Sequence, residues 1–467
     1  MTKISSLFYN SDSGIINTLH KNITPDEDQM KEQQNRWQDL GEYLKETLNE
    51  ETGIIISTWL QGSYKFRTQL RPIKGEEFDI DLGIYFEVSQ KPNEDQYNPK
   101  NLKHLVQKHL TEYSSLSTNN SVKVLDPPKE RCNRISFEGE FHIDTPCYYK
   151  IKDTNFTELA TESSGWENSD PKGLFDWFQN CFDESGRALA RRLIQYIKCW
   201  SNITFVNDKK DGSPSSILIT VLVAESLMEM PSSILDLYDD EALTKVVNHI
   251  LKKLISSNKV YNPVDNRECI SNRIEDFDIL LSELEKFSSV ANEAVDIDST
   301  IIAALKWQES FQHLFPIPTE EESIKSVNNS LTAYKFDPII NVVARSKTNE
   351  FYSRSDVNKI GPIAKNCSIE FQISNADQIP LGSKIQWMVR NHGNDSKYVN
   401  DFGHNAGNKI TATESSAYRG VHYMDCLITR DKQIIAFKRV PVEIEGLPIP
   451  KRNPPRPKWV NLRKKRG

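Results

Sequence analysis

The organisation of this chain is set by residues 61–68, Gln-Gly-Ser-Tyr-Lys-Phe-Arg-Thr, and by residues 77–84, Glu-Phe-Asp-Ile-Asp-Leu-Gly-Ile. Residues 54–60, which precede them, are apolar and largely β-branched, and this predicts a buried strand that ends at Gly62 and Ser63. A glycine at this turn lets a phosphate approach the backbone, and the N–H groups that follow can bind it. We therefore expect a strand, a tight turn, a short helix and a second strand.

The second strand carries two aspartates on one face. Strict alternation puts Asp79 and Asp81 opposite the face formed by Phe78, Ile80 and Leu82. Two carboxylates on the same strand face repel each other unless a cation lies between them. Hard divalent cations such as Mg²⁺ take oxygen ligands and bridge to nucleotide phosphates. The pattern therefore predicts a metal site on this face.

A third carboxylate follows on a later strand. Two apolar alternations run back to back across Gly139, which predicts a hairpin, and Asp144 faces opposite to Ile143. We expect Asp144 to complete the site that Asp79 and Asp81 begin.

A Gly-Ser turn, an Asp-x-Asp strand and a later Asp, in this order, resemble the nucleotidyltransferase fold of the DNA polymerase β superfamily. Residues 61–64 (Gln-Gly-Ser-Tyr), 78–81 (Phe-Asp-Ile-Asp) and 141–144 (Phe-His-Ile-Asp) are similar to the bacterial cGAS/DncV-like (CD-) nucleotidyltransferases. Each piece is a weak signal alone, and the three together are a strong one. The resemblance implies an α/β (α+β) nucleotidyltransferase fold with a helical lobe, followed here by a small β-rich, sandwich-like domain.

The resemblance also implies roles for these residues. Asp79 and Asp81 would hold two Mg²⁺ ions, or Mn²⁺, with the donor triphosphate. Asp144 would hold the metal that activates the acceptor hydroxyl and would take its proton. The candidate nucleotide- and phosphate-binding residues of the turn are Gln61, Gly62, Ser63 and Tyr64.

Three further phosphate-binding candidates lie on predicted helices. In the family a lysine near the end of the helix at 184–200 contacts the donor triphosphate, and Lys198 occupies the matching place, although a solvated basic face is the alternative. Ser215 or Ser216 matches a phosphate-contacting serine, and either could instead be only the N-cap of the helix at 217–228.

The composition narrows the class of protein. With 467 residues the chain is long enough for two or three domains, and its net charge of −7 argues against a broad nucleic-acid-coating surface. No apolar run approaches the length that spans a bilayer, and the N-terminus lacks a secretory layout, so we expect no membrane partner and a cytoplasmic location. The seven cysteines form no Cys-x-x-Cys pair. The zinc insertion of the animal DNA-sensing synthase is missing, so direct activation by duplex DNA through that device is not expected.

Apolar periodicity divides the chain into segments. We expect an irregular N-terminus (1–23), a nucleotidyltransferase domain (24–165) whose first helix has Thr24 as its N-cap, a helical lobe (166–316), a linker (317–365), a β-rich domain (366–450) and a basic tail (451–467). Within the lobe, helices are predicted at about 241–256, 273–287 and 290–314.

The β-rich segment contains four predicted strands, which suggest a sandwich: 369–373, 384–390, 421–429 and 433–444. Residues 387–391 and 418–423 resemble the adenylyl/guanylyl-cyclase-and-SMODS C-terminal sensor (AGS-C) domain, which implies ligand sensing. Three histidines in this segment fit loop hydrogen-bond partners better than metal ligands: His392, His404 and His422.

The resemblance to the CD-nucleotidyltransferases implies an enzyme that makes a cyclic di- or trinucleotide second messenger from NTPs. The resemblance implies a role in CBASS-type anti-phage defence with a neighbouring cyclic-nucleotide-responsive effector. The alternatives are a linear synthetase of the oligoadenylate-synthetase type and a non-catalytic nucleotide sensor. The chain ends at Gly467, and some relatives are conjugated through a C-terminal glycine by a ubiquitin-activating-like partner; a solubilising basic tail is the alternative.

Overall fold

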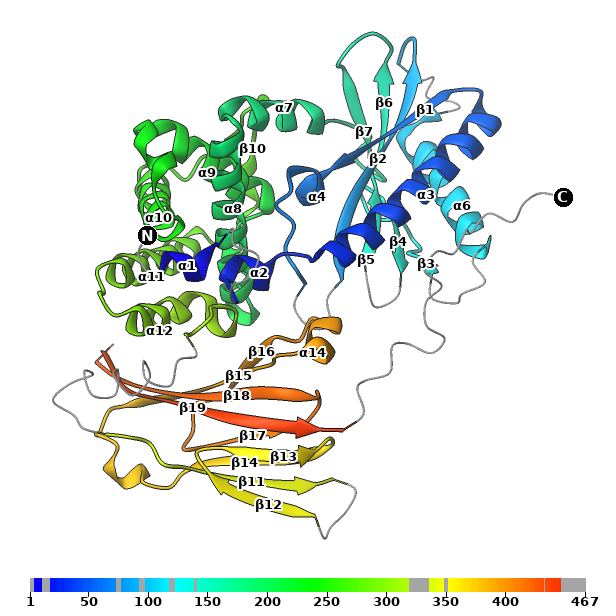
Figure 1. The fold of residues 1–467 in the computed structure, drawn as a ribbon. Helices are drawn as coiled ribbons and strands as arrows, with labels where there is room; N and C mark the ends of the chain where they lie inside the picture. Colours follow the sequence, from blue (N-terminus) through cyan, green and yellow to red (C-terminus); the bar gives the residue numbers. More distant parts are fainter. Residues whose placement is uncertain are drawn as a thin grey trace.

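The structure of the protein is a computed structural model that describes residues 4–10, 17–72, 77–91, 97–116, 122–137, 141–318, 336–347, 352–431 and 433–446. The basic tail and Gly467 lie outside the described residues, so the prediction about conjugation stays a prediction. In Figure 1 a mixed sheet and a helical lobe lie side by side, and a β-sandwich lies below them.

Eight strands form the mixed sheet. They are β1 (Ile55–Gln61), β2 (Phe78–Val88), β3 (Val122–Val124), β4 (Asn133–Phe137), β5 (Phe141–Thr145), β6 (Cys147–Ile151), β7 (Thr157–Ala160) and β8 (Trp166–Asn168). β2 pairs antiparallel with β1, and parallel with β5 along its first part and β6 along its second. The predicted hairpin is confirmed, because β4 and β5 pair antiparallel.

β1 is less buried than its composition predicts. Ile55 is exposed, and Ile56 and Gln61 are the buried positions of the strand. The reason is its place in the sheet, since among the described strands β1 pairs only with β2. An edge strand has one neighbour fewer to cover it.

The apolar face of β2 packs under two helices, α3 (Glu27–Thr52) and α6 (Pro99–Leu116). Ile80 and Leu82 are fully buried there with Leu44 of α3 and Val106 of α6. The predicted alternation of β2 is therefore confirmed, and the opposite face is left for the aspartates.

The prediction that Thr24 caps the first long helix was wrong. Asp26 is the N-cap, because its carboxylate accepts from the Gln29 N–H at 2.9 Å while the Gln29 side chain accepts from the Asp26 N–H at 3.0 Å. This reciprocal pair satisfies two backbone donors at once. The N-terminus is not irregular throughout either: α1 (Ser5–Phe8) and α2 (Leu19–Ile23) insert Phe8 and Leu19 into the helical-lobe core. Helices this short show no periodic signal in a sequence.

The helical lobe is built around α8 (Glu184–Thr204). Its other helices are α7 (Pro171–Cys181), α9 (Ser216–Glu229), α10 (Asp239–Ser256), α11 (Phe277–Val295) and α12 (Thr300–Phe311), with a small hairpin of β9 (Tyr261–Asn262) and β10 (Asp265–Cys269). The predicted helices at 273–287 and 290–314 were misplaced. Asp276 and Ser299 are the N-caps, so the break falls at 296–299.

The sandwich consists of two sheets, in the orders β12-β11-β14-β17 and β13-β19-β18-β15-β16. Its elements are β11 (Ile340–Ser346), β12 (Ser353–Val357), β13 (Ile360–Ala364), β14 (Cys367–Ile373), β15 (Lys384–Arg390), α14 (Asn394–Tyr398), β16 (Gly403–Gly407), β17 (Thr411–Ser415), β18 (Gly420–Arg430) and β19 (Gln433–Glu445). Short 3-10 helices complete the chain: η1 (Asn207–Gly212), η2 (Ser232–Asp236), η3 (Ile270–Arg273), η4 (Gln312–Leu314) and η5 (Ala376–Gln378).

The segment at 317–365 is not simply the linker that its composition suggests, because β11, β12 and β13 lie within it. β12 is an edge strand whose residues are mostly exposed, so it carries no apolar period that a sequence could reveal. β11 pairs with both β12 and β14 and belongs to the sandwich core.

The sandwich contacts the helical lobe through a small apolar cluster and one buried arginine. Ile301, Leu305 and Ile317 pack against side chains of β18 and β19. The Arg390 guanidinium donates to the carbonyls of His313 at 2.8 Å and Phe315 at 2.7 Å. None of the described helices combines the length and apolar character that crossing a bilayer requires.

Candidate active site

The three predicted carboxylates lie on one face of the mixed sheet. In the parallel register of β2 and β5, Asp79 pairs with His142 and Asp81 pairs with Asp144. Ligand atoms of Asp79, His142 and Asp144 all lie within 4.8 Å of one another. A carboxylate-rich cluster of this size is suited to a hard divalent cation.

Asp144 is held by two cations. The Arg134 guanidinium donates to both carboxylate oxygens, at 2.5 and 2.8 Å, and the Lys129 ammonium lies 3.2 Å from Oδ2. Burial alone raises the pKa of Asp144, but the Arg134 hydrogen bonds and the charges of Arg134 and Lys129 outweigh it and lower the pKa below its ordinary value. Asp144 is therefore ionised at neutral pH.

Asp81 is in the opposite electrostatic situation. Burial raises its pKa to about 7, and the nearby charges of Asp79 and Asp144 add to the effect. Asp79 is half exposed, and its Oδ1 lies 2.9 Å from Nε2 of His142. This crowding of negative charge, only partly offset by His142 and Arg134, is what a bound cation would relieve.

Gly62 lies directly against the Asp81 carboxylate. Its φ is +58°, and a Cβ built on it would lie 1.9 Å from Oδ2 of Asp81. Only glycine fits this position, because both the backbone conformation and the space exclude a side chain. Ser63, the next residue, is half buried and is the second residue of the short helix α4 (Gly62–Phe66). The predicted turn is thus adjacent to the predicted metal carboxylates.

The side chains of Gln61 and Tyr64 are engaged within the protein. Gln61 donates to the Tyr85 hydroxyl at 2.9 Å and accepts from the Tyr148 hydroxyl at 3.1 Å. Tyr64 packs toward α3, where its hydroxyl lies 3.3 Å from Nε1 of Trp37. Both residues shape the turn, and their contact with a nucleotide stays a prediction.

α8 brings Lys198 to the same region. The buried Lys198 ammonium donates to Oγ1 of Thr68 at 3.1 Å, just beyond α4. Burial lowers its pKa to about 8, and the charge of Asp81 works against this shift. One turn earlier, Gln195 donates to the Gln69 carbonyl at 3.2 Å, and Gln69 donates to the Asp79 carbonyl at 3.0 Å. The helical lobe thus contacts the catalytic strand through residues 66–69.

Known protein families and proteins resemble this chain over most of its length. Residues 56–148 match the family described as "Cyclic GMP-AMP synthase DncV-like, nucleotidyltransferase domain", and residues 306–445 match "Adenylyl/Guanylyl and SMODS C-terminal sensor domain". A protein from Escherichia albertii named cyclic GMP-AMP synthase is 30% identical over 449 residues, which cover 94% of this chain and 96% of that protein. This chain belongs to the cGAS/DncV-like nucleotidyltransferase family.

Other relatives and solved structures agree with that assignment. A cyclic GMP-AMP synthase from Vibrio cholerae is 24% identical over 310 residues, covering 56% of this chain and 68% of that protein. A structure of the Vibrio cholerae dinucleotide cyclase DncV has a TM-score of 0.57 at 20% identity and covers 69% of this chain and 99% of the other, which shows the shared fold. The chain is therefore an enzyme, a CD-nucleotidyltransferase, with a C-terminal sensor domain.

The two serines of this CD-nucleotidyltransferase have helix-terminal positions. The Ser215 hydroxyl accepts from the Leu218 N–H at 3.3 Å as the N-cap of α9, and Ser216 is exposed at its first position. The capping role that the sequence left open is confirmed for Ser215. Phosphate contact by either serine stays a prediction.

Sequence reasoning missed two polar residues of the site, Arg134 and His142. Both residues could have been identified from the strand patterns in the sequence. The β4–β5 register is symmetric about position 139, so a hairpin centred there places Arg134 opposite Asp144. His142 precedes Asp144 by two residues and shares its strand face.

In the sensor domain the rings of His404 and His422 are hydrogen-bond partners, whereas the ring of His392 packs edge-on against Tyr423, with the ring centroids 5.4 Å apart. Nδ1 of His422 accepts from the His392 N–H at 3.2 Å, and its Nε2 lies 2.8 Å from the Tyr418 carbonyl. Nε2 of His404 lies 2.7 Å from a carboxylate oxygen of Glu414.

Proposed function

We propose that this CD-nucleotidyltransferase joins NTPs into a cyclic dinucleotide. The same chemistry, with one more transfer step, would give a cyclic trinucleotide. The observation that carries the proposal is the in-register pairing of Asp81 with Asp144, with Gly62 packed against the Asp81 carboxylate. Relatives named cyclic GMP-AMP synthase and c-di-GMP synthase support the class of product.

The residues present fit a pair of divalent ions. Asp79 and Asp144 offer carboxylate oxygens within 4.8 Å of each other and of a His142 nitrogen, and Asp81 lies beside them, in register with Asp144. Burial, and after it the charges of Asp79 and Asp144, raises the pKa of Asp81, so a bound cation would favour its ionised form. In the proposal Asp79 and Asp81 hold two Mg²⁺ ions, or Mn²⁺, and Asp144 holds one of them. When bound, the ions would polarise the donor phosphate and lower the pKa of the acceptor hydroxyl.

The chain's own residues position the reactants. Asp144, kept ionised by Arg134 and Lys129, is the acceptor of the hydroxyl proton. Gly62 and Ser63 bring backbone N–H groups to the β- and γ-phosphates, and Gln61 and Tyr64 fix the turn that presents them. Lys198 supplies a desolvated positive charge behind the turn. Ser215 or Ser216 would add a hydroxyl contact.

We infer the cellular role from the family to which the chain belongs. The resemblance to the CD-nucleotidyltransferases implies a neighbouring cyclic-nucleotide-responsive effector and a role in CBASS-type anti-phage defence. Conjugation of Gly467 by a ubiquitin-activating-like partner would be an additional control in the same setting.

The test is product analysis of the purified protein with all four labelled NTPs and Mg²⁺ or Mn²⁺. A cyclic product has no terminal phosphate, so it should survive phosphatase treatment and have the mass of whole nucleotidyl units. A product that retains a 5′-triphosphate would instead show a linear synthetase. Absence of any product with either metal, from protein whose melting curve shows a folded state, would contradict the proposal.

A further inference from the structure

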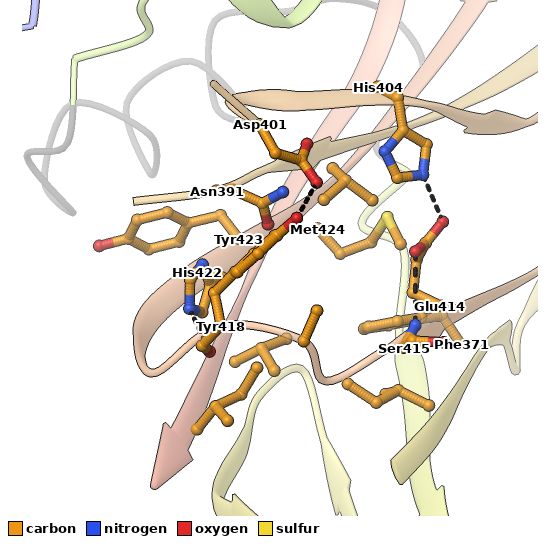
Figure 2. Close-up of a pocket in the computed structure, with 15 residues that line it drawn as sticks. Phe371, Asn391, Asp401, His404, Glu414, Ser415, Tyr418, His422, Tyr423 and Met424 are labelled. Carbon is orange, nitrogen blue, oxygen red and sulfur yellow. Dashed lines mark hydrogen bonds and ion pairs between the residues drawn. The ribbon is translucent and has the colours of Figure 1, made fainter. Parts of the chain in front are cut away.

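The sensor domain contains a cavity that the catalytic chemistry does not use. It has a volume of about 230 Å³ and lies between the two sheets of the sandwich (Figure 2). Its walls come from β14 and β17 of one sheet and from β15, β18 and β19 of the other. Residues 391–402, which connect β15 to β16, and His404 of β16 contribute to its rim.

The cavity has an apolar floor and a polar rim. The floor is formed by inward-facing side chains of both sheets, among them Ile369, Phe371, Val389 and Val442. Polar groups gather at the rim, as Figure 2 shows: Asn391, Asp401, His404, Glu414, Tyr418 and His422. An apolar interior with a few convergent polar groups is the usual constitution of a small-molecule site.

The charges at the rim are negative. Asp401 accepts a hydrogen bond from the Tyr418 hydroxyl, and Glu414 pairs with His404. None of the 15 described residues that line the cavity is a lysine or arginine. Burial lowers the pKa of His422, and both of its ring nitrogens have partners, so it stays neutral. A phosphate group would therefore meet the carboxylates of Asp401 and Glu414, and Lys347, a cation beside the rim, already donates to the Ser415 hydroxyl at 2.8 Å.

We propose that this cavity binds a small uncharged molecule with a flat apolar body and N–H or O–H donors along one edge, the chemistry of a nucleobase or nucleoside. The floor would take the flat body beside Phe371. The carboxyl groups of Asp401 and Glu414 offer acceptor oxygens, so they favour ligands that donate. The volume of about 230 Å³ lies below the roughly 300–1,000 Å³ of drug-sized sites, which favours a small ligand.

The rim is also connected to the catalytic half. Asn400, next to Asp401, accepts from the Gln29 side chain at 3.0 Å and from Arg71 at 3.4 Å. The Arg71 guanidinium lies 4.9 Å from the ring centre of Phe402. Arg71 follows Gln69, whose side chain donates to the Asp79 carbonyl.

A ligand that orders residues 391–404 would therefore act on the segment that supports the catalytic strand. In the proposal, occupancy of the cavity changes the rate of NTP turnover, and this part rests on the proposed function. The binding site itself does not depend on it.

Binding is tested by isothermal titration of the full-length protein, with the catalytic centre saturated by Mg²⁺ and a non-hydrolysable NTP analogue. The probes are adenosine, guanosine, cytidine and uridine and their 5′-monophosphates. At least one nucleoside should bind with 1:1 stoichiometry, and its monophosphate should bind at least about tenfold more weakly, because phosphate and rim carboxylates repel. The proposal is overturned if no nucleoside binds or if a monophosphate binds as tightly.

Two variants place that binding in the cavity. Ala417 is exposed at the mouth, so Ala417→Phe should fill it and abolish binding. The control is Thr413→Phe on the outer face of β17, which should bind as the wild type does. The comparison is valid if both variants melt within a few degrees of the wild type. Equal nucleoside binding by the two variants would contradict the assignment of the binding site to this cavity.

The connection is tested with Asn400→Gly. Asn400 has a φ of +56°, which glycine adopts without strain, and the change removes only the amide that meets Gln29 and Arg71. Nucleoside affinity should stay within about twofold, while the effect of the nucleoside on NTP turnover disappears. An unchanged effect in this variant would refute the connection. Lack of turnover in the wild type would refute the proposed function and leave the titration result standing.

Discussion

At the scale of single residues, the site depends on how closely the Gly62 backbone approaches Asp81. A Cβ on Gly62 would lie 1.9 Å from the carboxylate, and the residue also has a positive φ. Some other glycines with positive φ have open space around them, Gly53 among them. Comparing these two positions separates the cost of the backbone conformation from the cost of the contact with Asp81.

Gly62→Ala should destabilise the fold and displace the Asp81 carboxylate. The backbone strain alone costs about 1–2 kcal/mol, and Gly53→Ala, with a φ of +68°, should show that cost and keep its turnover. We expect Gly62→Ala to lose most of its NTP turnover, and we expect the remaining turnover to require a higher Mg²⁺ concentration. Melting temperature and Mg²⁺-dependent product formation measure the two effects. Equal turnover in both variants would contradict the role of Gly62.

Lys198 should make nucleotide binding depend on pH. Its pKa of about 8, lowered from 10.5 by burial, means that the positive charge is lost as the pH rises through about 8. The KM for NTP should therefore rise between pH 7.5 and 9.5. Lys198→Met should raise the KM roughly 10- to 100-fold at pH 7.5, for a charged hydrogen bond of about 1.5–3 kcal/mol, and remove this pH dependence. A KM that is unchanged beside a lowered melting temperature would show a structural lysine.

At this scale, the sequence alone predicts which residues share one face of a strand. Asp79, Asp81 and Asp144 come together because period 2 and parallel pairing are regular. The partners of Asp144 depend on which strands become neighbours. Lys129 reaches the carboxylate from outside any strand, and its position follows from no local pattern.

At the scale of helices and strands, the ends of elements decide which side chains reach the site. Ser215 is the N-cap of α9, and its hydroxyl could meet a phosphate only if it serves both roles. Ser299 caps α12 in the same way, because its hydroxyl accepts a hydrogen bond from the N–H of Ile302, three residues later. The two caps therefore offer a matched pair of positions.

Ser215→Asp should keep the cap and weaken nucleotide binding. Aspartate caps a helix about as well as serine, so melting temperatures of Ser215→Asp and Ser299→Asp should stay near the wild type. If Ser215 contacts a phosphate, the new carboxylate repels it and raises the KM for NTP at least about tenfold, while Ser299→Asp leaves the KM unchanged. Identical KM values in both variants would leave Ser215 as a cap only.

Whether an element could be predicted depends on how many neighbours it has. β2 is covered on one face by α3 and α6, so its alternation is clear in the sequence. β12 lies at an edge with most of its residues exposed, and α1 is four residues long, so neither has a period to detect. This is why 317–365 reads as a linker and 1–23 as irregular.

At the scale of the whole molecule, the sandwich is anchored by charges buried in its own core. Asp425 is 2% exposed and bonds Arg390 at 2.6 Å and Arg439 at 2.7 Å. Arg390 in turn holds the carbonyls of His313 and Phe315 at the end of the helical lobe. One carboxylate thus supports both the sandwich and its docking.

Asp425→Asn should destabilise the protein by about 3–5 kcal/mol, because two buried guanidinium groups lose their countercharge. Asp337→Asn is the control: Asp337 pairs with Lys438 at 3.1 Å, but its side chain is 62% exposed, so the change should cost less than about 1 kcal/mol. Urea denaturation measures both. A similar loss for the two variants would show that Asp425 is not the anchor.

In the proposed mechanism, Asp79 and Asp81 hold the ions for nucleotidyl transfer. The most direct measurement is NTP turnover by the double variant Asp79→Ala, Asp81→Ala beside the wild type, with Mg²⁺ varied. Removing both carboxylates also removes their mutual repulsion, so the metal-free variant should melt no lower than the metal-free wild type. We expect product formation to fall on the order of 1,000-fold or more, and Mg²⁺ to stop raising the melting temperature. Turnover near the wild-type rate by the double variant would contradict the account.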